Sequence, residues 1–148
     1  MKLSMACPYF YPVEREFGGG WAFPARLPLG AGFRGVCRVN ADEFSPNDAA
    51  LRDCCNLGHA HSCPRMPALR HADSVRFMVA ADSDGRVVID YVFDLGHAPA
   101  GHGRIEYDCA NQKWLATIAD TCAQRQAECY LAVYLEKHPR SANGSSAP

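Results

Sequence analysis

Residues 73–95 read DSVRFMVAADSDGRVVIDYVFDL and decide the fold. Two runs rich in β-branched and aromatic residues flank the turn-forming DSDG, so the segment predicts an antiparallel hairpin. Alternation places Val75, Phe77 and Val79 on one face of the first strand. In the second strand, Val87, Ile89, Tyr91 and Phe93 share one face and Val88, Asp90, Val92 and Asp94 share the other. GRIEYD, residues 103–108, predicts a third strand.

A long helix follows the predicted strands. Between Gln112 and Lys137, apolar residues recur at helical spacings of three, four and seven: Leu115, Ile118, Ala119, Cys122, Cys129 and Val133. We expect this helix to cover one face of the hairpin. The fold class predicted is therefore α+β, with a hairpin or three-stranded sheet packed on a long C-terminal helix.

The N-terminal half lacks such regularity. Residues 1–40 are rich in glycine, proline and aromatic residues and show no sustained period of 2 or 3.6, which predicts irregular structure. Ordering such a chain costs about 1 to 2 kcal/mol per residue, and a metal cross-link would offset part of that cost. Ser45 as N-cap and Pro46 at the first helical position predict a short helix over residues 46–55.

The length of 148 residues suits one domain. We assign residues 1–138 to it, with a metal-binding loop region at 1–70 and the sheet and helix at 73–138. The tail, residues 139–148, reads RSANGSSAP after Pro139 and predicts disorder.

Composition narrows the class of protein. The net charge of -1 gives no electrostatic reason to expect nucleic acid as a partner, and no apolar run approaches the roughly 20 residues that span a bilayer. The start, MKLSMACPYFYP, shows no apolar signal segment with a cleavage site, so we expect a cytoplasmic protein. In that compartment eight cysteines point to metal binding, thiol chemistry or core packing rather than to stable disulfides.

The eight cysteines divide into two groups. Cys122 and Cys129 lie on the apolar stripe of the last helix, where a free thiol packs as a small hydrophobe, and Cys109 has no cysteine close to it in sequence. The irregular half carries the candidates for metal ligands: Cys7, Cys37, the pair Cys54 and Cys55, and Cys63. A proline follows both Cys7 and Cys63, as it follows the last cysteine of the bacterial ferredoxin ligand run.

Spacing favours a cluster over a single ion. Cys7, Cys37, Cys55 and Cys63 are separated by 29, 17 and 7 residues, whereas structural zinc sites usually present close pairs such as C-x2-C. We therefore expect a four-cysteine iron-sulfur cluster (4Fe-4S), with zinc as the alternative. Neighbouring cysteines on a helix point about 100 degrees apart, and Cys55, nearer the helix end, is the preferred ligand over Cys54.

The string CNLGHAHSCP at residues 55–64, preceded by LGAGFRGVC and by CPYF, resembles small bacterial cysteine-rich proteins with a CP…C…CNxGxA…CP layout. The resemblance covers roughly residues 7 to 80. It implies Cys7, Cys37, Cys55 and Cys63 as one set and implies no reaction. His59 stands where that group has an aromatic residue, which leaves a histidine ligand open.

Two further readings stay open at this stage. Cys54, His59 and His61 are possible additional ligands, and a zinc-stabilised interaction module is the alternative function. A thiol-dependent enzyme, with Cys54 or Cys55 activated by His59, is the third. The leading hypothesis is an iron-sulfur protein with a structural or electron-transfer role and an unknown redox or protein partner, because four cysteines leave no open coordination position for substrate.

Overall fold

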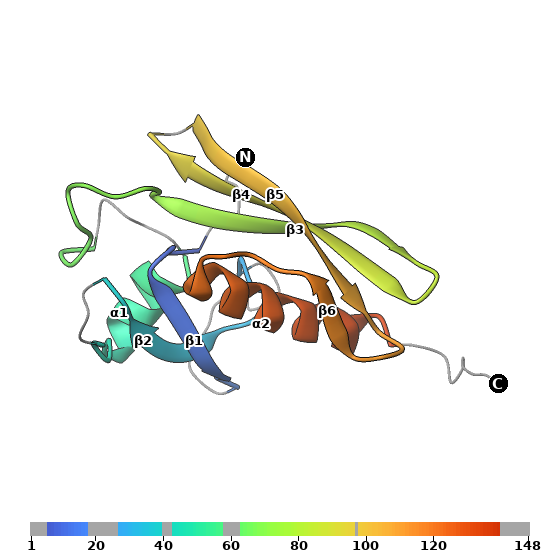
Figure 1. The fold of residues 1–148 in the computed structure, drawn as a ribbon. Helices are drawn as coiled ribbons and strands as arrows, with labels where there is room; N and C mark the ends of the chain where they lie inside the picture. The colour runs from blue at the N-terminus through green and yellow to red at the C-terminus, as the bar shows by residue number, and fades with distance from the viewer. Residues whose placement is uncertain (1–5, 18–26, 40–42, 58–62, 97, 140–148) are drawn as a thin grey trace.

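The predicted hairpin lies at one edge of a four-stranded antiparallel sheet (Figure 1). The computed structural model describes residues 6–17, 27–39, 43–57, 63–96 and 98–139. Its sheet has the order β3 (Ser74–Ser83), β4 (Arg86–Leu95), β5 (Ala98–Asp108) and β6 (Lys113–Ala116). The turn between β3 and β4 places Asp84 and Gly85 at φ of 54° and 75°, the left-handed conformation that a two-residue hairpin turn requires. The hairpin and the third strand are confirmed.

The sheet buries the face that carries Val87 and Ile89. Phe77 pairs with Tyr91 and Val79 pairs with Ile89. The buried face of β4 is therefore the one that carries Val87, Ile89, Tyr91 and Phe93. Val87, Ile89 and Ile105 have no exposed surface and form a core with three residues of α2 (Thr121–Lys137): Ala123, Ala127 and Leu131. The α+β fold is therefore confirmed, with the helix packed on the sheet.

The last helix begins nine residues later than the sequence predicts. Lys113–Ala116 instead forms β6 and pairs with β5, and Gln112 adopts a positive φ of 53° in the turn between them. Asp120 caps the helix, because its side chain accepts a hydrogen bond from Ala123 N. The prediction of a helix from Gln112 was wrong because Leu115 and Ile118 fit helical spacing by coincidence.

A second layer lies on the other side of α2 (Figure 1). β1 (Phe10–Arg15) and β2 (Phe33–Cys37) form a two-stranded antiparallel sheet, so the prediction of wholly irregular structure before residue 40 was wrong. Cys129 and Val133 of α2 join a core with residues of this layer: Ala6, Cys7, Phe10, Leu29, Ala31 and Phe33. The helix thus separates two small cores.

Gly35 allows the two short strands to pair. A Cβ added at Gly35 would lie 2.1 Å from the backbone oxygen of Tyr11 on β1, so only glycine fits this close approach. Arg125 links α2 to β1, because its guanidinium donates hydrogen bonds to Pro12 O at 2.7 Å and to Val13 O at 2.9 Å.

The short helical segment ends where the sequence predicts and begins later. It consists of α1 (Asp48–Ala50) continued by a π-helical turn, η2 (Leu51–Cys55). Its N-cap is Asn47, whose side chain accepts from Ala50 N at 2.8 Å, and not Ser45. The Asn47 amide oxygen reaches the free N–H of the first turn, which fixes the start two residues downstream.

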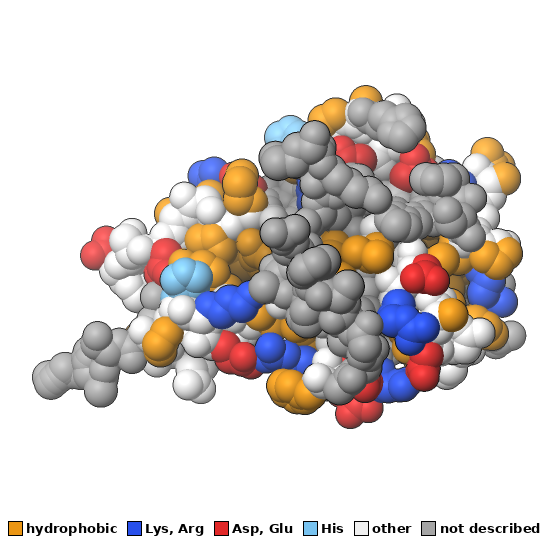
Figure 2. All heavy atoms as spheres, turned by 180° about the vertical axis from the view of Figure 1, so that it is seen from behind, with side chains coloured by type: hydrophobic (Ala, Val, Ile, Leu, Met, Phe, Trp, Pro, Cys, Tyr) orange, Lys and Arg blue, Asp and Glu red, His pale blue; other side chains and the backbone are white. Residues whose placement is uncertain are grey.

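The surface carries both signs of charge. Figure 2 shows Lys and Arg side chains interspersed with Asp and Glu on one face, in agreement with the net charge of -1. No helix within the described ranges combines the length and the apolar character needed to cross a membrane. The predicted tail disorder concerns residues that, from 140 onward, lie outside the described residues.

Candidate metal centre

Cys7 lies in a tight turn that leads into β1. Its side chain is 8% exposed, its backbone N–H donates to Cys55 O at 3.3 Å, and its carbonyl accepts from Phe10 N at 3.2 Å. Burial raises the pKa of the Cys7 thiol to about 12, while the backbone N–H groups of Tyr9 and Phe10 donate to its sulfur and oppose that rise. Burial outweighs these two N–H groups, so the pKa of the Cys7 thiol stays raised.

Cys37 ends β2, directly opposite the end of that turn. Its register partner on β1 is Phe10. Its backbone N–H donates to Phe44 O at 2.7 Å, and its carbonyl accepts from Phe44 N at 3.0 Å. These bonds fix the end of β2, where Cys37 is buried.

Cys55 ends η2 and is also buried, with 7% of its surface exposed. The next residue, Asn56, is 1% exposed and satisfies all its bonding groups: Oδ1 accepts from Phe33 N at 3.0 Å, and Nδ2 donates to Phe33 O at 3.0 Å and to Leu51 O at 2.8 Å. Asn56 thus fixes the end of η2 against the start of β2, the strand that carries Cys37.

The neighbouring thiols of Cys54 and Cys55 have different surroundings. Burial raises the pKa of the Cys55 thiol well above its usual range, and the thiols of Cys7, Cys37, Cys63 and Cys54 each raise it further. Cys54 is half-buried, and burial raises the pKa of its thiol. Among the other cysteines, only Cys63 raises it further, through its charge and through a hydrogen bond. The Cys55 thiol therefore feels the charges of all three other predicted ligands, whereas the Cys54 thiol feels only that of Cys63 among them.

The four predicted ligands are thus electrostatic neighbours, although they come from four separate segments of the chain. Burial is the main cause of the raised pKa of Cys7, and the charges of Cys37 and Cys63 raise it further. At Cys55, burial again comes first, and the charges of Cys7, Cys37 and Cys63 all raise the pKa further. All eight cysteines are free thiols. Among the described residues, no group of three or more His, Cys, Asp or Glu side chains has an arrangement that could hold a metal ion.

The predicted histidine ligands cannot be placed beside the thiols, because His59 and His61 lie outside the described residues. His71, which the sequence did not single out, lies near the Cys7 turn. Its ring meets the ring of Tyr9 edge-on at 5.8 Å, and its Nε2 is 3.6 Å from an oxygen of Asp120. These contacts place it at the border of the site.

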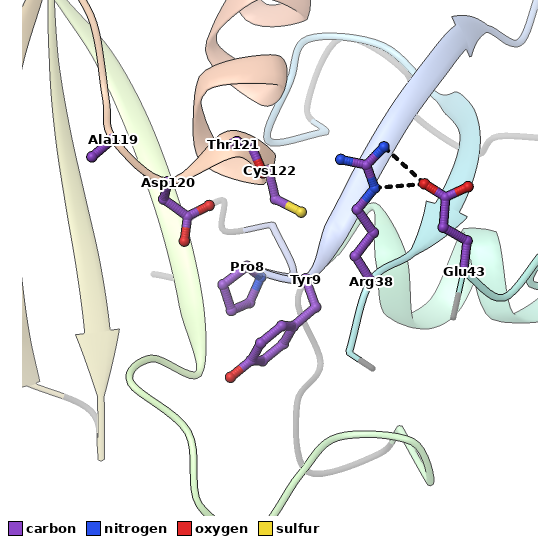
Figure 3. Close-up of a pocket in the computed structure, with 8 residues that line it drawn as sticks. All are labelled: Pro8, Tyr9, Arg38, Glu43, Ala119, Asp120, Thr121 and Cys122. Atoms are coloured by element: carbon purple, nitrogen blue, oxygen red, sulfur yellow. Dashed lines mark hydrogen bonds and ion pairs between the residues drawn. The ribbon is translucent and has the colours of Figure 1, made fainter. Parts of the chain in front are cut away.

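A cleft of about 580 Å³ opens beside the Cys7 turn (Figure 3). Pro8, Tyr9 and Arg38, which follow Cys7 and Cys37 in sequence, line one side, and the first turn of α2 lines the other. Arg38 pairs with Glu43 at 2.8 Å and lies 3.7 Å above the ring of Tyr11. The cleft gives solvent an approach to the surroundings of the thiols.

Cys122 points into this cleft (Figure 3), but its chemistry does not suit a nucleophile. Burial raises the pKa of the Cys122 thiol to about 11, and burial likewise raises the pKa of Cys54 and Cys55, so all three stay protonated near neutral pH. Catalytic cysteines show the reverse, a lowered pKa. The surroundings of these thiols therefore disfavour the thiol-dependent enzyme.

Sequence reasoning missed two buried carboxamides, Asn56 and Gln126. The Nε2 group of Gln126 donates to Cys7 O at 2.7 Å and to Phe10 O at 2.8 Å. The available signal was a polar residue on an apolar stripe, since Gln126 lies four residues after Cys122 and three before Cys129. The core role predicted for Cys129 is confirmed, since it is 5% exposed and packs in the core beside the two-stranded sheet, whereas Cys122, 7% exposed, lines the cleft.

Comparison with protein-family models, with curated proteins and with solved structures gives no match.

Proposed function

We propose that Cys7, Cys37, Cys55 and Cys63 bind one metal centre, and that this centre is an iron-sulfur cluster. The observation that carries the proposal is that the charges of Cys37 and Cys63 act on the buried Cys7 thiol, and those of Cys7, Cys37 and Cys63 act on the buried Cys55 thiol, although the four cysteines come from separate segments. Cys7 adds a second support, because the backbone N–H groups of Tyr9 and Phe10 lower the pKa of its thiol against the effect of burial. Such N–H donors to sulfur are among the features that tune iron-sulfur clusters.

Binding would require the thiols to lose protons and to turn toward a common point. A rotamer change costs on the order of 1 kcal/mol per side chain. Structural metal sites supply far more, about 10 to 16 kcal/mol for zinc in small peptides at neutral pH. The raised pKa of Cys7 means that thiolates are costly here without a cation, and a bound metal removes that cost.

A cluster suits these segments better than one zinc ion. The ligand spacings of 29, 17 and 7 residues contain no tight C-x2-C turn, and each ligand sits on a separate segment. A cluster is larger than one ion and accepts ligands from points further apart. Zinc remains the alternative that metal analysis distinguishes.

The proposed role is electron transfer or structural support. Four cysteine ligands leave no open position for substrate at the metal. Phe10 and Phe33 are buried in the adjoining core and limit solvent on one side, and the cleft at Pro8 and Arg38 opens on another. An unidentified redox or protein partner would approach from the open side.

Anaerobic purification followed by metal and sulfide analysis tests the proposal. We expect about four iron and four sulfide per chain, with absorption near ~400 nm that bleaches on reduction. Colourless protein with one zinc per chain would refute the cluster and support the zinc-stabilised module. Protein without any metal would refute both.

Single variants test the ligand set. Cys55→Ser should lose the metal and Cys54→Ser should keep it, because Cys7, Cys37 and Cys63 all act on the Cys55 thiol and only Cys63 of these acts on the Cys54 thiol. Cys129→Ser is the matched control, since Cys129 is a comparably buried thiol outside the set. Loss of metal in the Cys129 variant as complete as in the Cys55 variant would show a general folding effect and contradict the assignment.

A further inference from the structure

The cleft beside the Cys7 turn carries opposite charges on its two sides. Its volume of about 580 Å³ lies within the range of small-molecule sites, about 300 to 1,000 Å³. Figure 3 shows Arg38 on one side and Asp120 on the other, with Pro8 and Tyr9 between them. Arg38 directly follows β2 and Asp120 caps α2, so the packing of these elements brings a cation and an anion to one cleft.

The guanidinium of Arg38 is fixed and keeps one nitrogen for the cleft. Its Nε and Nη2 both contact Glu43 Oε2 at 2.8 Å, and its central carbon lies 3.7 Å from the centre of the Tyr11 ring. The remaining nitrogen, Nη1, points away from Glu43 toward the cleft (Figure 3). A guanidinium held in advance loses little side-chain freedom when it binds a carboxylate.

The N-terminus of α2 adds hydrogen-bond donors beside Arg38. The cap takes up Ala123 N, and the N–H groups of Thr121 and Cys122, which both line the cleft, have no acceptor within the helix. The Cys122 side chain is 7% exposed and points into the cleft (Figure 3). In the part of the chain that the structure describes, its thiol has no hydrogen-bond partner. These donors suit one anionic group.

The carboxylate of Asp120 keeps one oxygen for a ligand. Oδ1 accepts from Ala123 N at 2.9 Å, whereas Oδ2 lies 3.6 Å from His71 Nε2, which is beyond hydrogen-bond distance. With Glu43 and Arg38, the charged side chains of the lining sum to one negative charge. A simple anion would therefore meet two carboxylates, and a simple cation would meet the guanidinium. A molecule that carries both charges matches both sides.

We propose that this cleft binds a small zwitterion of the α-amino acid class, with its carboxylate between Arg38 and the N-terminus of α2 and its ammonium group on Asp120. Pro8 and the ring of Tyr9, which lie between the two charges, offer an apolar surface to the carbon skeleton. The inference goes beyond the proposed function, because it uses none of the four predicted cysteine ligands and requires no metal.

Calorimetric titration of the full-length protein with each common α-amino acid tests the inference. At least one should bind with a Kd below about 1 mM. The best ligand is then compared with two analogues, one without the amino group and one without the carboxylate. Each analogue should bind about tenfold or more weakly, the scale of one lost charge-assisted hydrogen bond.

Two variants test the two sides of the cleft. Asp120→Asn and Arg38→Gln should each weaken binding of the best amino acid about tenfold or more. Asparagine caps a helix as well as aspartate does, so Asp120→Asn removes the charge and keeps the cap. Arg86→Gln is the matched control, because Arg86 pairs with Glu106 at 3.0 Å and does not line the cleft.

The contrary results are distinct. Absence of binding by every amino acid, or equally tight binding of an analogue with one charge, would refute the inference. An equal loss in Arg86→Gln would show a general effect and contradict the assignment to the cleft. Should Arg38→Gln not fold, the analogues and Asp120→Asn still decide. Metal-free protein that binds an amino acid would refute the proposed function alone, and metal-loaded protein that binds none would refute this inference alone.

Discussion

Replacing Asn56 with alanine removes three hydrogen bonds from a side chain that is 1% exposed. Leu51 O keeps a partner, because the backbone N–H of Asn56 also donates to it at 3.1 Å. The N–H and carbonyl of Phe33 each lose the bond to the carboxamide, at about 1 to 3 kcal/mol for each buried group left unpaired. We expect a loss of about 3 kcal/mol in the free energy of unfolding.

The assay is urea unfolding of the metal-free chain, followed by circular dichroism, with a thermal scan beside it. A loss of about 3 kcal/mol lowers the thermal midpoint by roughly 6 to 12 °C for a domain of this size. Asn111→Ala is the control, because Asn111 is exposed and bonds through its side chain to Asp108. A loss below about 1 kcal/mol in Asn56→Ala would refute the view that this carboxamide joins η2 to β2.

Three further outcomes follow from other contacts. Gly35→Ala should lower the free energy of unfolding in urea by about 2 kcal/mol or more, because the added Cβ would lie 2.1 Å from the Tyr11 carbonyl oxygen. Gly101→Ala is the control and should cost less, because its Cβ would lie 3.9 Å from a ring atom of Phe93. Mild oxidation of the metal-free protein by a diazene oxidant should link Cys54 to Cys63, which share a hydrogen bond, and peptide mapping that finds another first disulfide would contradict this contact. Burial raises the pKa of the Cys129 thiol from 9.0 to about 11, so its contribution to stability is complete below pH 9 and is lost as the pH rises toward 11. Between pH 9 and 11, the free energy of unfolding should therefore fall less in Cys129→Ala than in the wild type.

The sheet was predictable because its signals are local. The alternation around Val79 and Ile89 and the DSDG turn agree with each other, and the structure pairs these strands as expected. The start of the last helix was not predictable from spacing, since Leu115 and Ile118 match a helical stripe while Lys113–Ala116 pairs with a strand. There, a partner distant in sequence overrides the local pattern.

The β1–β2 ladder was missed for a related reason. Pro12 and Gly35 interrupt the local pattern, yet Gly35 is what permits the strands to approach. Within the candidate site, the cysteines stood out by residue type and by their position outside regular periodicity. Gln126 did not, because its role depends on the Cys7 turn lying against α2, a contact between opposite ends of the chain.

X-ray absorption at the metal edge of anaerobically purified protein tests the central claim most directly. We predict iron with a sulfur-only first shell at about 2.3 Å, as for thiolate ligands generally, and a second shell of neighbouring iron. The wild type should lose this signature when Cys55 is replaced by serine and keep it when Cys129 is. A first shell of nitrogen or oxygen, or protein that holds no metal, would contradict the claim that Cys7, Cys37, Cys55 and Cys63 bind one centre.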